Sequence, residues 1–302
     1  MPSQTLLLLP PLARLDDVEG LPRLLGRADV LPARPAGLLP ALADAFALPA
    51  AGLPAAALLR EAAAHDAGGS VWLCADPVYV QPDANGARLL AWGEMALAAE
   101  ESEELARPLR PVLGDTGMLL EISAPSRWQL RLREGTPLPA FATPEQVLGQ
   151  SLLMHLPQGA QGRRWRALFN ELQILLHQHP RNRARIAAGL PPINALWFWG
   201  GGALPARPRT RLTALLSADA VARALALHAQ VALIDDPAQA AGTGALWLDL
   251  AAADAPCVGA HLAGAMRRMR RGDSLELAFL DGRRWHVTSG QRWRFWRRAW
   301  QR

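Results

Sequence analysis

The sequence predicts an α/β protein with a mixed sheet and flanking helices, and three observations lead to this class. Runs with strand character alternate with runs of helical periodicity over much of the 302 residues. The first run, Thr5–Leu9, is continuous and apolar, which is typical of a strand buried on both faces. The last two runs, Leu275–Leu280 and Arg283–Val287, flank an Asp-Gly pair, which favours a C-terminal β-hairpin.

The first half of the chain contains most of the predicted strands. Prolines divide residues 16–69 into short helices such as Ala55–Ala64. A surface helix is expected over Glu94–Leu105, because its glutamates share one face. The strands predicted from short runs rich in branched and aromatic residues are Ser70–Ala75, Val78–Val80, Arg88–Trp92, Met118–Ile122 and Trp128–Leu132.

The second half begins with a helix start. Thr143 can cap a helix, Pro144 suits its first position, and Gln146 completes a capping box. A longer helix, from Arg163 to about Gln178, places its apolar side chains on one face. The remaining elements expected are a strand over Ala195–Trp199, a helix capped by Ser217 and ending at His228, strands over Val231–Ile234 and Ala245–Leu250, and a helix over Val258–Arg271.

The domain organisation expected from composition has two parts. Residues 1–69 form an N-terminal strand and an Ala/Leu/Pro-rich helical segment, and residues 70–302 form an α/β domain. One continuous domain over residues 1–302 is the alternative. No apolar run reaches the roughly 18–20 residues of a membrane span. The short Leu6–Leu9 run and the two cysteines without a disulfide pattern favour a cytoplasmic protein.

Groups suited to an anionic ligand gather between residues 177 and 202. Arginine gives bidentate contacts to phosphate or carboxylate, asparagines can orient a loop, and glycines let backbone N–H groups approach closely. The candidate ligand-binding residues are Asn182, Arg185, Asn194, Gly200, Gly201 and Gly202, with His177 and His179 as weaker candidates for acid–base work. Alternatively, the arginines form an ordinary solvated face, the histidines contact carbonyls at a helix end, and the glycines form a plain turn.

A family resemblance follows from the same segment. The pattern His-Pro-x-Asn-x-x-Arg-x-x-x-Gly-x-Pro-Pro-x-Asn-x-x-Trp-x-Trp-Gly-x-Gly, over His179–Gly202, resembles the archaeal-type cofactor-independent phosphoglycerate mutases. A closer resemblance is to a proteobacterial mutase-like group, the RpfE-type regulatory proteins. The resemblance extends more weakly over residues 70–302, through Ala75-Asp76-Pro77-Val78, the segment around Arg127-Trp128 and the terminal Phe295-Trp296-Arg297-Arg298.

The resemblance implies a reduced alkaline-phosphatase-like fold and a phosphoryl transfer through a serine with two divalent metals. This sequence departs from that pattern, because Pro10-Pro11 follows the first strand where the mutases have an aspartate ligand. Ser70 is the serine that follows a Gly-Gly turn, and the weak metal-ligand candidates are Asp249, Asp254 and His261. We therefore expect a catalytically degenerate protein that binds a phosphorylated or anionic small molecule in a regulatory role, without a cofactor.

Two alternatives remain open. One is an active metal-dependent phosphoglycerate mutase or phosphatase, which would need a divalent metal. The other is an adaptor for nucleic acid or for an acidic protein, because residues 262–302 carry eleven arginines and three acidic residues, a net charge of +8. Its candidate contact residues are Arg292, Arg294, Arg297 and Arg298. Against this adaptor stands a structural reading, in which the tryptophans of this segment are core anchors and the arginines stack outside them.

Overall fold

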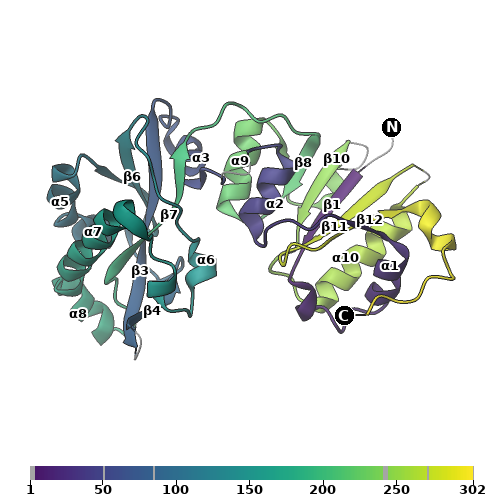
Figure 1. Ribbon diagram of the computed structural model, residues 1–302, viewed down its shortest axis with the longest axis horizontal. Coiled ribbons are helices and arrows are strands. Elements are labelled where there is room, and N and C mark those ends of the chain that lie inside the picture. Colours follow the sequence, from purple (N-terminus) through teal and green to yellow (C-terminus); the bar gives the residue numbers. More distant parts are fainter. Residues whose placement is uncertain (1–3, 50–51, 84–85, 241–243, 271, 302) are drawn as a thin grey trace. The chain divides into compact units, whose positions relative to one another are not determined.

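The computed structural model describes residues 4–49, 52–83, 86–240, 244–270 and 272–301. The chain folds into two compact units (Figure 1): unit 1 comprises residues 1–53 and 207–302, and unit 2 comprises residues 54–206. Both units combine helices with a sheet, so the predicted α/β class with a mixed sheet is confirmed. Among the described residues, no helix has the length and apolar character that a membrane crossing requires.

The division of the chain differs from the one expected from composition. The expected boundary after residue 69 lies inside unit 2, between α3 (Ala55–Ala64) and β3 (Ser70–Asp83), which contact each other. The N-terminal segment instead joins the C-terminal one, because β1 (Gln4–Leu9) inserts between β10 (Ala245–Asp249) and β11 (Ser274–Phe279). Such pairing between the two ends of a chain has no local signal in composition.

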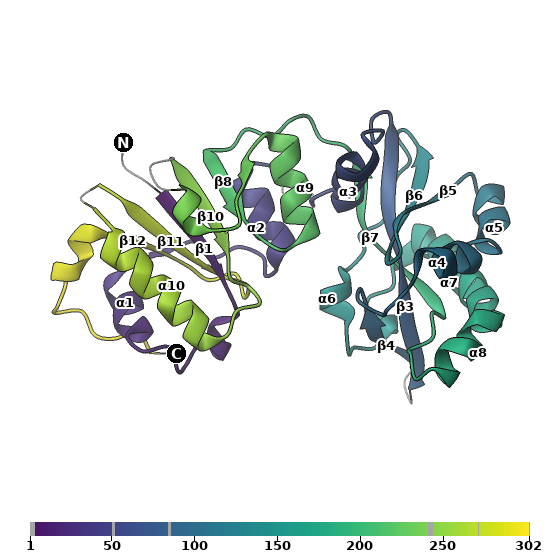
Figure 2. The ribbon, with the colours of Figure 1, turned by 180° about the vertical axis from the view of Figure 1, so that it is seen from behind.

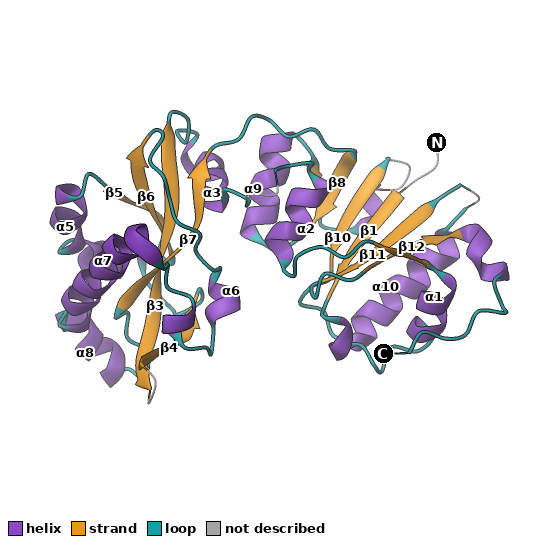
Figure 3. Cartoon of the chain, viewed as in Figure 1, coloured by secondary structure: helices purple, strands orange, loops and turns teal. Residues whose placement is uncertain are grey.

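The described part of unit 1 contains a seven-stranded sheet in which β1, β8, β9, β10 and β11 run parallel, β12 pairs antiparallel with β11, and β2 pairs antiparallel with β12. In spatial order the strands are β2 (Asp29–Leu31), β12 (Arg284–Thr288), β11, β1, β10, β8 (Leu212–Leu216) and β9 (Ala232–Leu233). As Figures 1 and 3 show, α1 (Leu21–Arg27) and α10 (Ala255–Arg268) cover one face, and α2 (Leu38–Ala45) and α9 (Ala220–Ala229) lie on the other.

The apolar run of β1 explains its central place in this sheet. Leu7 and Leu9 belong to the hydrophobic core under α1 and α10, together with Leu262 of α10 and Leu277 of β11. Leu8, on the alternate face, is also fully buried. A strand that is covered on both faces needs apolar side chains at every position, so the prediction of a buried first strand is confirmed.

The described part of unit 2 is built on the long strand β3, which pairs with strands on both of its sides (Figure 2). The two strands predicted as Ser70–Ala75 and Val78–Val80 are one strand that continues through Pro77. The other strands are β4 (Gly86–Trp92), β5 (Leu119–Ala124), β6 (Arg127–Arg133) and β7 (Ala195–Ala203). The helices are α3, α4 (Ala99–Ala106), α5 (Leu109–Asp115), α6 (Pro144–Val147), α7 (Gly159–His177) and α8 (Pro180–Ala187).

Local capping decides where several helices begin. The capping box of Thr143 and Gln146 is present at α6, as predicted. In contrast, α9 is capped by Asp219, whose carboxylate accepts a hydrogen bond from the backbone N–H of Ala222. Ser217, the expected cap, instead donates its hydroxyl to Asp249. The Ser217 hydroxyl thus bonds a residue that is distant in sequence, and Asp219 caps the helix in its place.

Candidate functional site

Helix α8 carries the centre of the predicted anion site. It begins at Pro180, where the imidazole Nδ1 of His179 caps it by accepting a hydrogen bond from the backbone N–H of Arg181. Asn182 therefore lies inside the helix. Asn182 and Arg185 are three residues apart on a helix, and both side chains are buried in unit 2.

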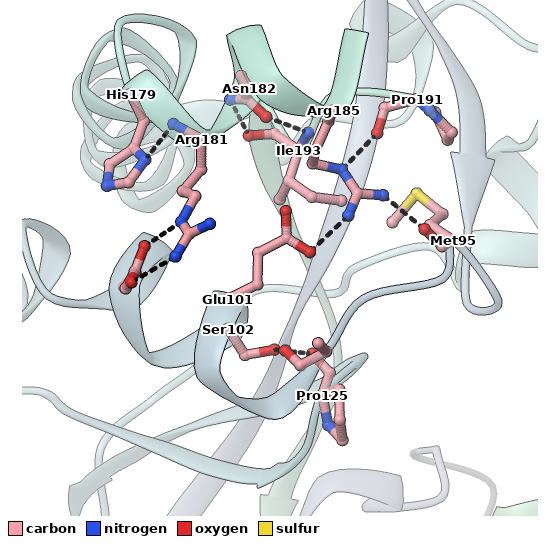
Figure 4. A network of polar contacts seen from close by, with 12 residues as sticks. Met95, Glu101, Ser102, Pro125, His179, Arg181, Asn182, Arg185, Pro191 and Ile193 are labelled. Atoms are coloured by element: carbon pink, nitrogen blue, oxygen red, sulfur yellow. Dashed lines mark hydrogen bonds and ion pairs between the residues drawn. The ribbon is translucent and has the colours of Figure 1, made fainter. Parts of the chain in front are cut away.

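Arg185 uses its guanidinium entirely within the protein (Figure 4). Its Nη1 donates to the carboxylate of Glu101 on α4 at 2.8 Å, its Nε to the carbonyl of Pro191 at 2.8 Å, and its Nη2 to the carbonyl of Met95. The side chain is 1% exposed. An anion could reach this guanidinium only by displacing Glu101, so we assign Arg185 a structural role in place of the predicted anion clamp.

The two asparagines of the motif tie loops to helices and strands. The amide of Asn182 donates to the carbonyls of Leu176 (2.7 Å) and Ile193 (2.8 Å), and its oxygen accepts from the N–H of Ile193 (2.7 Å). Asn194 makes the same kind of two-way bond to the backbone of Val80 on β3. Both side chains are buried and act on backbone groups, so neither is placed to orient a ligand.

The two histidines differ in their surroundings. His177, at the end of α7, is exposed. His179 is half-buried as the cap of α8. The next residue but one, Arg181, forms a bidentate pair with Glu104 of α4, which lowers the pKa of that carboxyl group. Two ion pairs, through Arg181 and Arg185, therefore join α8 to α4 (Figure 4).

The glycines continue β7 rather than forming a loop after it. A Cβ on Gly200 would lie 2.8 Å from the Cβ of Ala55, and one on Gly202 would lie 2.8 Å from the Cβ of Pro54. A Cβ on Gly201 would lie 2.4 Å from a methyl group of Leu138. The glycines thus let α3 and its neighbours approach β7, and Gly200 also has a φ of +63°.

A buried charge cluster around Asp76 of β3 was not singled out as a site by sequence reasoning. Its carboxylate accepts from the indole N–H of Trp92 (3.1 Å) and of Trp199 (2.9 Å) and from Arg127 (2.7 Å). Burial raises the pKa of Asp76, and the Arg127 guanidinium opposes this effect. Burial likewise raises the pKa of the nearby Cys74 thiol. The four residues of this cluster lie in four different strands, so no local sequence pattern joins them. The only sequence signal was the weak family resemblance at Asp76 and Arg127.

The weak metal candidates lie in unit 1 and do not form a cluster. Asp249, at the end of β10, accepts from the Ser217 hydroxyl at 2.5 Å and from the N–H of Ala251. Asp254 caps α10, and the imidazole of His261 hydrogen-bonds the carbonyl of Cys257 one turn before it. Across the described residues, no three His, Cys, Asp or Glu side chains gather in a metal-binding group.

The arginines of the C-terminal segment divide into two kinds. Arg294 and Arg297 pair with Asp29 of β2, and the pairing with Arg294 lowers the pKa of that carboxyl group. Arg292 and Arg298 are exposed. Two tryptophans of this segment serve as anchors: Trp285 is buried and packs edge-to-face on the half-buried Trp300, at 5.9 Å between ring centroids.

The chain resembles known proteins over part of its length. It is 31% identical over 109 residues to a probable 2,3-bisphosphoglycerate-independent phosphoglycerate mutase of Geobacter sulfurreducens, covering 36% of this chain and 27% of that protein. It is 30% identical over 114 residues to the corresponding mutase of Methanothrix thermoacetophila, covering 37% and 28%. Over this stretch the chain is a distant homologue of the cofactor-independent phosphoglycerate mutases. It spans little more than a quarter of these relatives, and no family model matches it.

Two solved structures were also found by comparison of folds. The cofactor-independent phosphoglycerate mutase of Thermoplasma acidophilum superposes with a TM-score of 0.39 and 12% identity, covering 96% of this chain and 90% of that one. The PH0037 protein of Pyrococcus horikoshii gives a TM-score of 0.44 and 10% identity, covering 94% and 86%. The relationship to the mutases accordingly rests on sequence similarity over about a third of the chain.

Proposed function

We propose that this chain is a mutase-like protein that binds a phosphorylated or otherwise anionic small molecule without converting it, in a regulatory role like that of the RpfE-type proteins it resembles. One observation supports the loss of catalysis: the groups at the carboxyl ends of the parallel strands of unit 1 are occupied by bonds within the chain. That edge is the usual place for a ligand in sheets of this kind, so an anion bound by this chain needs a different place.

The edge does not suit the pair of metals that the mutase resemblance implies. A two-metal phosphoryl-transfer site needs several acidic or imidazole ligands converging on both ions. Here β1 ends before Pro10, and Asp249 is bonded through both carboxylate oxygens, to Ser217 and Ala251. Asp281, after β11, accepts from the N–H of Leu12. These residues hold the edge together.

The place for an anion is a cavity of about 430 Å³ near the amino ends of β1, β8 and β10. This volume lies within the usual range for small-molecule sites. Two acids line it, Asp44 and Glu276, and two arginines pair with them: Arg34 with Asp44, and Arg284 with both. Arg209 and Arg211, both exposed, line the same cavity. With the acids neutralised, these two guanidinium groups leave the cavity positive, which favours a phosphate or carboxylate.

Two measurements on the full chain test this proposal. Conversion of 3-phosphoglycerate is assayed with Mg²⁺, Mn²⁺ or Zn²⁺, and no turnover is expected. Binding of 3-phosphoglycerate and of inorganic phosphate is measured by titration calorimetry. The double variant R209A/R211A should weaken binding about 10-fold or more, whereas R183A, an exposed arginine on α8, should not change it.

The outcomes separate the parts of the proposal. Metal-dependent turnover that is lost in D249A would establish the active-enzyme alternative. Binding that R209A/R211A leaves unchanged would place the anion elsewhere. If neither probe binds, the anion-binding function itself is wrong.

A further inference from the structure

An open groove of about 270 Å³ lies in unit 1 beside α1 and α10 and belongs to none of the sites above. Its apolar lining comes from both helices and from β12: Leu21, Leu24, Leu262, Ala263, Met266 and Val287. A methionine is suited to such a surface because its flexible side chain adapts to different apolar partners. The groove thus offers the side-by-side apolar contacts that a helix can fill.

The rim of the groove is positively charged. Arg23, Arg27 and Arg292 line it, against one acid, Glu19. The rim is therefore complementary to carboxylates.

Next to this rim, the chain exposes three large aromatic side chains. Trp293, Phe295 and Trp296, here called the aromatic cluster, are 65%, 75% and 69% exposed. Arg292, which lines the groove, stacks over the ring of Trp293 at 5.1 Å. Exposed aromatic groups beside an apolar groove are typical of protein-binding surfaces, because tryptophan and arginine are enriched among the residues that dominate binding energy.

The segment that carries the aromatic cluster is held in place. Arg294, between Trp293 and Phe295, and Arg297, after Trp296, pair with Asp29, and the N–H of Trp300 donates to the carbonyl of Pro22 on α1 at 2.8 Å. A Cβ on Gly26 would lie 2.1 Å from the carbonyl oxygen of Arg298, so the segment lies directly on α1 at a glycine. The cluster is thus presented by an anchored segment, which lowers the entropy lost on binding.

We propose that this groove binds an acidic amphipathic helix of a partner protein, with the aromatic cluster packing against one end of that helix. Apolar side chains of the helix would enter the groove, and its glutamates or aspartates would pair with Arg23, Arg27 and Arg292. A concave apolar groove favours a helix over the other anionic partners. A membrane surface is met by a protruding apolar face, and a nucleic acid could pair its phosphates with the rim arginines but would leave the apolar lining without a partner.

The test uses a designed, fluorescently labelled peptide whose leucines recur with helical spacing and whose remaining positions are mostly glutamate. Two control peptides have the same composition in scrambled order and lysine in place of glutamate. Fluorescence anisotropy with the full chain should give micromolar binding for the Leu/Glu peptide and at least 10-fold weaker binding for both controls. An absence of binding by the Leu/Glu peptide would overturn the proposal.

Variants of exposed residues locate the binding without disturbing the core. R23E/R292E should weaken the Leu/Glu peptide at least 10-fold and strengthen the lysine peptide, and W293S/W296S should weaken the Leu/Glu peptide several-fold. R183E, on α8 of unit 2, is the matched control and should change neither. Binding that both groove variants leave unchanged would refute the site. Tighter, variant-sensitive binding of duplex DNA or of phosphatidylserine vesicles would replace the peptide with that partner.

Discussion

Two arginine-rich segments of this chain are similar in composition but differ in structural role. In unit 2, Arg181 and Arg185 pair with Glu104 and Glu101, and the Arg185 guanidinium is withdrawn from solvent. In unit 1, the C-terminal segment uses some arginines to anchor itself and leaves three aromatic side chains exposed. The difference teaches that a basic motif acquires its role from the acids that tertiary folding brings to it. The first motif builds the fold, and the second presents a surface.

The largest expected effect on stability is at the buried ion pair of Arg185 and Glu101. R185M should lower the free energy of unfolding by about 3–5 kcal/mol, because Glu101 and two carbonyls lose their donor in a buried setting. Urea denaturation followed by circular dichroism measures this effect. R183M, on the exposed side of the same helix, should stay within about 0.5 kcal/mol of the natural chain. Equal, small effects of both variants would show that Arg185 is not the structural centre of the motif.

The next largest effect on stability is expected at Gly200 of β7. G200A should cost about 2–4 kcal/mol, since alanine at a φ of +63° is strained and its Cβ meets Ala55. Gly189 also has a positive φ, of +73°, but nothing lies within 4 Å of its Cβ position. G189A should therefore cost about 1–2 kcal/mol, from backbone strain alone. If the two variants unfold at the same urea concentration, close packing on α3 does not explain Gly200.

A smaller loss is expected at the buried amide of Asn182. N182A should lower stability by about 1–3 kcal/mol, because the buried N–H and carbonyl of Ile193 lose the partner that Asn182 gives them. Thermal unfolding of the full chain measures the change. N170A, at an exposed position of α7, serves as the control and should be nearly neutral. A neutral N182A would return Asn182 to the list of ligand-binding candidates.

The smallest effect belongs to the C-terminal segment and depends on pH. Arg294 lowers the pKa of Asp29, so the ionised carboxylate favours the folded state. This contribution is present above the unfolded pKa of about 3.9 and is lost as the pH falls through the lower folded value. Because the Asp29 side chain is 47% exposed, D29N should cost less than about 1 kcal/mol at pH 7.

Denaturation of the natural chain and of D29N at pH 7 and near pH 3 measures this dependence. The two proteins should converge in stability as the pH falls. A difference that grows at acid pH would contradict the assignment of the Asp29–Arg294 pair as an anchor of the segment.

Much of the fold could be predicted from local patterns, and the role of the motif could not. The helix Ala55–Ala64 has the predicted bounds, and the capping box at Thr143 is present, because both depend on neighbouring residues. The start of α8 and the continuation of β7 through its glycines were not predicted. The imidazole cap of His179 is an unusual one, and the partners of Gly200 and Gly202 are the first residue of α3 and the residue before it, far away in sequence.

The sequence by itself determined the α/β class, most of the elements and the relationship to the mutases over about a third of the chain. Periodicity, turn residues and motif spacing are local properties, and they survive in a one-dimensional pattern. Only the tertiary structure decided that the two ends of the chain share one sheet and that Arg185 faces a glutamate instead of solvent. The physical reason is that burial and ion pairing depend on which distant residues become neighbours.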